Sequence, residues 1–144
     1  MGRSTASTWE VLTLLATCPG CRSDKPEVRV RAAFETCRAA VEAGDARGAT
    51  AALDPTFQGP DGMDKGMAQL FLMGTFRREK VGVTVVRNEV AVKGIEAVQD
   101  VDLILTGRSG GLIPHDASHH SFRLRWRKTG DDWKLAELQP FDDR

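Results

Sequence analysis

The sequence predicts an α+β domain in which three helices come first and a bent antiparallel sheet follows. Up to about residue 79, apolar residues recur at intervals of three and four, as on one face of a helix. After residue 80, apolar and polar residues alternate, as in strands with one buried face. The chain has 144 residues, 41% of them hydrophobic and 28% charged, which fits one domain with its own core. Helices followed by strands give the α+β order.

Three helices are expected before the sheet. The first begins near Val28, after Pro26, and ends at Gly44. Its predicted apolar face consists of Val30, Ala33, Phe34, Cys37 and Val41. Asp45 is a suitable N-cap for a short second helix that runs to Leu53, where Asp54-Pro55 stops it.

The third helix is predicted after a loop rich in glycine and proline at residues 58–62. Asp64 can cap this helix, which reaches about Glu79. Basic residues at its end suit the negative pole of a helix. The predicted apolar face of the third helix is formed by Met67, Leu70, Phe71 and Gly74.

The sheet is predicted to consist of long strands joined by glycine turns. Valines alternate over residues 81–85 and resume on the other parity at residues 90–92, which predicts a bulge near Arg87-Asn88. Lys93-Gly94 is a turn signal, and a second strand follows through residues 101–105. A loop with three glycines spans residues 107–117. Another strand at residues 122–127, a turn at residues 129–131 and a last strand to about residue 141 complete the chain.

Residues 1–21 are predicted to be a leader, followed by a linker at 22–27 and a single domain at 28–144. The leader has a short basic start, a mostly apolar stretch at residues 9–17 and then small residues, an order typical of a secretory signal. No window holds the ~18 consecutive apolar residues that a membrane-spanning helix needs.

Leu15-Ala16-Thr17-Cys18 resembles the bacterial lipobox, in which the cysteine is lipidated. We therefore expect an exported protein, either periplasmic or anchored through a lipid on Cys18, with Cys21 as the alternative acceptor.

A redox dithiol at Cys18 and Cys21 stays open, although such a motif normally opens a helix in a βαβ unit. A structural zinc site at the cysteines is not expected, because such a site needs four ligands and the third cysteine, Cys37, is distant in the sequence. Cys37 lies on a predicted apolar helix face and is expected to be a core residue.

The order of these elements resembles the nuclear transport factor 2-like superfamily, which includes ketosteroid isomerases and polyketide cyclases. The resemblance spans residues 28–141 and is carried by four segments in order. They are the helix end AAVEAGD (39–45), the step LDPTF (53–57), the strand EVAVKG (89–94) and the final hairpin WRKTGDDWKL (126–135). The resemblance implies a cone in which helices and a curved sheet enclose a pocket. It does not imply one activity, because this scaffold carries unrelated functions.

The resemblance also implies which side chains meet inside the cone. Leucines and aromatic residues on the inward parity of the strands would face the helices, with Phe57 near the mouth. Core packing and contact with an apolar or aromatic ligand are both open for this set. The candidate ligand-binding residues are Phe34, Phe57, Met67, Phe71, Leu103, Phe122, Leu124 and Trp126. Leu105 shares the inward parity.

No complete catalytic constellation is evident in the sequence. The resemblance implies an isomerase mechanism in which a carboxylate base acts together with a tyrosine. This chain has no tyrosine. Asp100 and Asp102 are on the parity expected to face outward. His120 shares the parity of Phe122, so it could enter the pocket as an acid or base.

Three interpretations are open for the histidines. His115, His119 and His120 lie within or just after the glycine-rich loop, and with Asp116 they could hold a metal ion. His120 alone could act in the pocket. The interpretation that we favour is a polar loop, so no metal ion and no cofactor are predicted.

Twenty basic and twenty acidic residues balance, which is unlike the basic patch of most nucleic-acid-binding proteins. Arg123, Arg125 and Arg127 form a stripe on one face of a strand, about 7 Å apart. We expect these arginines to pair across strands with Asp100, Asp102 or Glu137. A homodimer formed through this face would therefore have a polar interface.

We expect the chain to be a non-enzymatic module that binds a small apolar ligand or a protein partner. The alternative function is a small isomerase- or cyclase-type enzyme that uses His120 or an aspartate as general base. The alternative location is the cytoplasm, with residues 1–21 as a tail.

Overall fold

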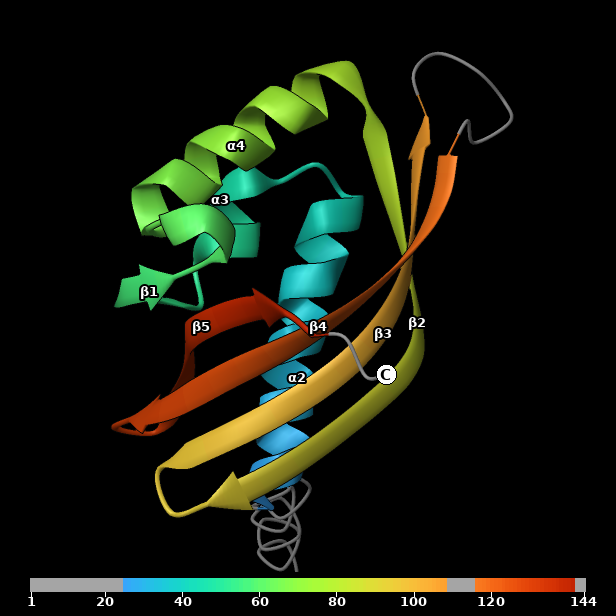
Figure 1. Cartoon of the computed structure of the whole chain (residues 1–144). Coiled ribbons are helices and arrows are strands. Elements are labelled where there is room, and N and C mark those ends of the chain that lie inside the picture. Colours follow the sequence, from blue (N-terminus) through green and yellow to red (C-terminus); the bar gives the residue numbers. More distant parts are fainter. Residues whose placement is uncertain (1–24, 109–115, 142–144) are drawn as a thin grey trace, which may run out of the picture.

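The computed structural model describes residues 25–108 and 116–141, and its side chains between residues 108 and 117 lie outside the description. The fold is α+β, with helices on one side of a five-stranded mixed sheet (Figure 1). The elements in chain order are α2 (Pro26–Glu42), α3 (Ala46–Thr50), β1 (Leu53–Gln58), a 3-10 turn (Pro60–Gly62), α4 (Lys65–Arg78), β2 (Lys80–Lys93), β3 (Glu96–Arg108), β4 (Asp116–Thr129) and β5 (Asp132–Pro140).

The sheet has the strand order β1-β5-β4-β3-β2. Strands β2 to β5 form an antiparallel meander, whereas β1 pairs with β5 in parallel. The expectation of a purely antiparallel sheet is therefore wrong at this edge. The strand β1 also occupies residues that were expected to end the second helix, and it separates α3 from α4 in the chain. Pro55 is compatible with β1 because an edge strand can lack one backbone donor.

Helix α2 crosses the sheet, and α3 and α4 lie beyond its C-terminal end (Figure 1). Pro26 stands at the first helical position, where a missing N–H costs little. Val30 and Phe34 are buried, as the apolar spacing predicts. Gly44 follows the helix with φ +74°, a conformation that favours glycine.

The caps of the two following helices are confirmed. The Asp45 carboxylate accepts a hydrogen bond from Gly48 N at 2.9 Å, and the Asp64 carboxylate accepts one from Met67 N at 2.8 Å. The second helix, however, ends at Thr50 rather than at Leu53.

The bulge predicted in the long first strand of the meander is present. The pairing of β2 with β3 shifts register between Val85 and Arg87, which changes the parity of the residues that face the helices. Val83 and Val85 therefore face inward before the bulge, and Val90 does so after it. The turns at Gly94 and Gly130, with φ of +63° and +62°, are also confirmed.

The core lies between α2 and the inner face of the sheet, which is the face that carries Leu103, Leu124 and Trp126. These three side chains are at most 8% exposed. The inward parity predicted for β3 and β4 is thus confirmed. Within residues 25–108 and 116–141, no helix is long and apolar enough to span a membrane.

The apolar face predicted for the third helix is not the face that packs. Met67, Leu70 and Phe71 are 52%, 69% and 58% exposed, whereas Ala68 on another side of α4 is buried. Helix α4 packs mainly on α3 and β1, and the Lys65 ammonium donates a hydrogen bond to Leu53 O at 3.0 Å. The small Ala68 side chain allows this close packing. The larger apolar residues of α4 are left in contact with solvent.

Candidate functional site

The candidate site lies at the end of the sheet where β2 begins. Leu103 and His120 are cross-strand partners of β3 and β4, so their side chains share the inner face. The His120 ring is nevertheless exposed. It stacks on the Phe122 ring with centroids 5.9 Å apart and an interplanar angle of 18°, and His120 Nε2 lies 2.9 Å from Ser118 Oγ. An accessible imidazole thus stands beside an aromatic ring at this end of the inner face.

Helix α4 ends beside the same end of the sheet, because only Glu79 separates it from β2. At about 100° per residue, Met67 and Phe71 lie on the opposite side of α4 from Gln69, Met73 and Phe76. The latter three line a hollow against α3. Met67 and Phe71 therefore point away from α3 and are more than half exposed.

The deeper candidate residues form a packed core. Phe34, Phe57 and Leu103 are each at most 8% exposed and belong to one cluster. Phe57 is therefore buried and does not rim an opening. Leu124 and Trp126 are buried in the same cluster, while Phe122 is half-buried at its border. Contact of these residues with a ligand stays a prediction.

A chain of hydrogen bonds fixes the polar groups inside the core. Trp126 Nε1 donates to Gln99 Oε1 at 2.9 Å, and Gln99 Nε2 donates to Asn88 Oδ1 at 2.8 Å. Gln99 is 0% exposed. Gln99 was not predicted to be buried, although it shares the inward parity of Val101 and Leu103. Its amide is engaged on both sides and leaves the Trp126 N–H satisfied.

The outer face of the sheet carries charge pairs, which confirms the expected pairing for Arg123 and Arg125 but not for Arg127 within the described residues. Arg123 donates to both carboxylate oxygens of Asp100, at 2.8 and 3.0 Å, and its guanidinium lies 4.1 Å from the centroid of the Phe141 ring. Arg125 pairs with Glu137 at 3.8 Å. Asp102 accepts from Ser121 Oγ at 2.7 Å and pairs with Arg87 at 3.3 Å.

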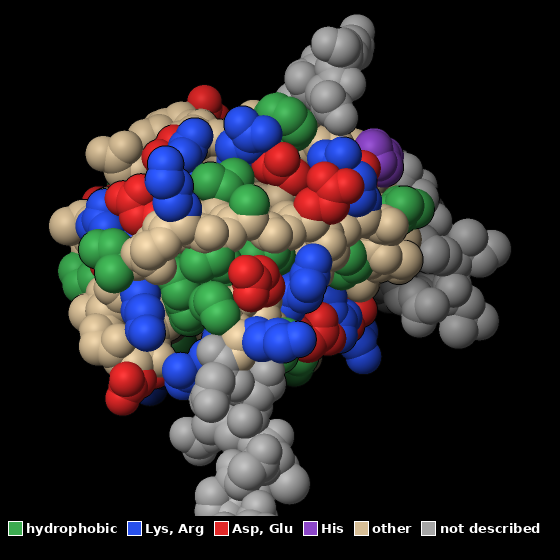
Figure 2. Space-filling view, turned by 90° about the horizontal axis from the view of Figure 1, so that it is seen from below, with side chains coloured by type: hydrophobic (Ala, Val, Ile, Leu, Met, Phe, Trp, Pro, Cys, Tyr) green, Lys and Arg blue, Asp and Glu red, His purple; other side chains and the backbone are tan. Residues whose placement is uncertain are grey.

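Because of these pairs, Asp100 and Asp102 are not placed to act as bases on the inner face of the sheet. Hydrogen bonds from Arg123 hold the pKa of the Asp100 carboxyl below its ordinary value, so Asp100 is a weaker base. Both aspartates also lie on the outer face. The face that Figure 2 shows carries basic and acidic side chains interspersed, as the balanced net charge suggests.

The described residues hold no cluster of three or more potential metal ligands. His119 and His120 are exposed on β4, while the His115 and Asp116 side chains lie outside the described residues. Cys18 and Cys21 also lie outside them. Cys37 is half-buried and is not part of the buried core cluster that was predicted to include it, and burial raises the pKa of its thiol.

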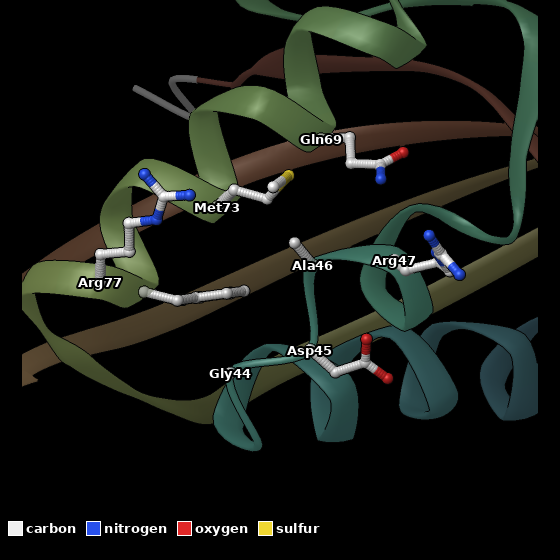
Figure 3. Close-up of a pocket in the computed structure, with 8 residues that line it drawn as sticks. Gly44, Asp45, Ala46, Arg47, Gln69, Met73 and Arg77 are labelled. Atoms are coloured by element: carbon white, nitrogen blue, oxygen red, sulfur yellow. The ribbon is translucent and has the colours of Figure 1, made fainter.

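Two hollows open on the surface away from the predicted ligand-binding residues. One, of about 380 Å³, lies between α3 and α4 (Figure 3). The other, of about 540 Å³, lies between α2 and the turn that joins β4 to β5, beside Trp133. Sequence reasoning did not find either hollow, because each combines segments that are distant in the chain.

No family model and no curated protein match this sequence. Solved structures with similar folds are numerous. A variant of Rv3472, a protein of unknown function from Mycobacterium tuberculosis, has a TM-score of 0.69 at 14% identity, covering 81% of this chain and 71% of its own. A protein from Novosphingobium aromaticivorans, provisionally named a scytalone dehydratase, has a TM-score of 0.70 at 9% identity over 78% of this chain and 80% of its own.

A third similar structure is provisionally named a dehydratase of the NTF2-like family, from Streptomyces avermitilis. Its TM-score is 0.66 at 17% identity, and the match covers 78% of this chain and 91% of its own. At such low identities, the likeness concerns the fold and not the activity. The helices on a curved sheet and these structural neighbours together show that the chain has the NTF2-like fold.

Proposed function

We propose that the chain binds a small apolar ligand between α4 and the inner face of the sheet. The observation that carries this proposal is that apolar side chains of α4 and of the inner face of the sheet are only partly covered by the rest of the domain. Met67 and Phe71 are more than half exposed on α4. Phe122 and Leu105 are half-buried on the neighbouring strands. Large apolar side chains that are exposed to solvent are typical of binding surfaces.

His120 supplies a polar group on the inner face of the sheet, beside Phe122. Ligand sites combine an apolar wall with a few polar groups that orient the ligand. The His120 ring extends the aromatic surface of Phe122 and is exposed to solvent, with Nε2 at hydrogen-bond distance from Ser118 Oγ. A flat aromatic ligand that carries one hydrogen-bonding group fits this arrangement best.

Fluorescence titration with N-phenyl-1-naphthylamine, a neutral aromatic probe, tests the proposal. Phe71→Ser should weaken binding at least fivefold. Ile95→Ser is the matched control, because Ile95 is similarly exposed, at 61%, but lies in the turn between β2 and β3, at the other end of the sheet. Equal affinity of the two variants and the unsubstituted protein would contradict the proposal.

An enzyme that uses His120 as general base is the second candidate. The accessible imidazole beside Phe122 favours it, since a neutral imidazole can accept a proton near neutral pH. The test is exchange of the C1 protons of 2-tetralone in deuterated water, followed by NMR. Exchange that is faster than in buffer and is lost in His120→Asn, but kept in His119→Asn, supports catalysis. Exchange at the buffer rate argues against this second candidate.

Export and lipid attachment form a separate part of the proposal and rest on the sequence of residues 1–21. Expression of the full chain in a bacterial host with an alkyne-labelled fatty acid tests it. Labelling should disappear in Cys18→Ala and persist in Cys21→Ala. Unlabelled protein in the cytoplasmic fraction would instead support an intracellular location.

A further inference from the structure

The hollow between α3 and α4 has the dimensions and the chemistry of a second binding site. Its volume of about 380 Å³ lies within the ~300–1,000 Å³ that is usual for small-molecule pockets. It is separate from the surface that carries Met67 and Phe71, because its lining residues project from the other side of α4. The lining residues are Gly44, Asp45, Ala46, Arg47, Gln69, Met73, Phe76 and Arg77.

The floor of this hollow is apolar. Ala46 is buried, and its small side chain leaves room between the two helices. Phe76 is half-buried and Met73 is 38% exposed, so an aromatic ring and a thioether face the same space. Both groups make favourable contacts with flat apolar molecules.

Two guanidinium groups flank the floor. Figure 3 shows Arg47 and Gln69 toward one end of the hollow and Arg77 toward the other. Arg47 projects from α3 and Arg77 from α4. Neither arginine forms an ion pair or a side-chain hydrogen bond with any residue of the described ranges 25–108 and 116–141.

Asp45, the carboxylate among the residues that line the hollow, forms no ion pair with Arg47 or Arg77. The Asp45 side chain is directed to the first turn of α3, where it accepts the hydrogen bond from Gly48 N at 2.9 Å. A Cβ atom at Gly48 would come within 2.4 Å of Asp45 Oδ2, so glycine permits this position of the carboxylate. The arginines of the hollow therefore keep their charge available for a ligand.

We propose that this hollow binds a small aromatic carboxylate. A guanidinium presents a planar fork of N–H donors that matches the two oxygens of a carboxylate. The apolar body of the ligand would cover Met73 and Phe76. A bare inorganic anion would leave this floor uncovered and is therefore a poorer match. The proposal does not depend on the ligand proposed for the inner face.

NMR titration of the ¹⁵N-labelled full chain with 2-naphthoate tests the assignment. The side-chain amide of Gln69 and the Nε–H groups of Arg47 and Arg77 should shift together on binding. Because the two guanidinium groups lie toward opposite ends of the hollow, one of them pairs with the carboxylate, so at least one of Arg47→Gln and Arg77→Gln should weaken binding at least fivefold. Arg78→Gln is the matched control, because this neighbouring arginine of α4 does not line the hollow. It should leave the affinity unchanged.

Two further probes identify the chemistry that is recognised. Naphthalene-2-carboxamide has the same shape without the charge and should bind at least tenfold more weakly than 2-naphthoate. Inorganic phosphate should not compete at equal concentration. Equal binding of the acid and the amide, competition by phosphate, or losses of affinity in both Arg47→Gln and Arg77→Gln that are no larger than in Arg78→Gln would overturn the proposal. Phe71→Ser should not affect naphthoate binding, so the inner-face site can fail independently.

Discussion

The Glu42 carboxylate accepts a hydrogen bond from the backbone N–H of Val83 at 3.1 Å, which links the end of α2 to the free edge of β2. A second link lies further along the same strand, where Arg31 Nη2 donates to Asn88 O at 3.2 Å. Edge strands expose unpaired backbone groups that can recruit other chains. Here, two side chains of α2 occupy such groups on both sides of the bulge.

Glu42→Ala should destabilise the fold by about 1 kcal/mol, because the Val83 N–H then loses its partner. The value is modest because the Glu42 side chain is 40% exposed and water can replace part of the interaction. The Arg38–Glu42 ion pair is lost as well. Urea denaturation measures the change. Glu42→Gln is the control, since its amide oxygen can still accept from Val83, and it should recover part of the lost stability.

Among the polar side chains of the core, Gln99 is the one whose replacement should lower the free energy of unfolding most. In Gln99→Leu, the buried Trp126 Nε1 loses its acceptor, which costs about 1–3 kcal/mol. Asn88→Ala removes the acceptor of Gln99 Nε2, but Asn88 is half-buried, so water can replace the lost acceptor and the substitution should cost less. Urea denaturation of the two variants measures the difference. Similar losses in both variants would show that the Trp126–Gln99 bond is not the important one.

The strands could be predicted well because each has one buried face. Alternation in β3 and β4 correctly assigned Leu103, Leu124 and Trp126 to the core, and the change of parity in β2 located the bulge. The charge pairs across β3 and β4 follow from the same alternation. Gln99 was missed because a polar residue inside an apolar pattern was not taken as buried.

The elements at the edge of the fold were less predictable. A run that includes Asp54 and Pro55 resembles a helix stop, and only its parallel pairing with β5 makes it a strand. On α4, apolar residues occupy more than one side, so periodicity alone cannot show which side packs. The packing side is selected by Ala68, whose small size suits close contact with α3 and β1.

The Asp100–Arg123 pair should make the free energy of unfolding depend on pH in the acidic range. The hydrogen bonds from Arg123 lower the pKa of the Asp100 carboxyl in the folded state. The unfolded chain therefore binds a proton at Asp100 more readily than the folded chain does. The contribution is therefore complete above the ordinary pKa of about 3.8 and is lost as pH falls through the lower folded value. The stability difference between the unsubstituted protein and Asp100→Asn should shrink below pH 4. Urea denaturation at pH 6 and pH 3 tests this, and a difference that stays constant would contradict it.

Replacing Phe71 should leave the fold intact, which separates its proposed ligand contact from a structural role. Phe71 is 58% exposed, so Phe71→Ser should change the free energy of unfolding by less than about 0.5 kcal/mol. Leu103→Ala, by contrast, removes a side chain that is 8% exposed within the central cluster and should cost about 2–5 kcal/mol. Thermal and urea denaturation compare the two variants. A large loss in Phe71→Ser would mean that this ring packs against the domain in solution, and its weaker probe binding would then reflect damage to the fold rather than a lost contact.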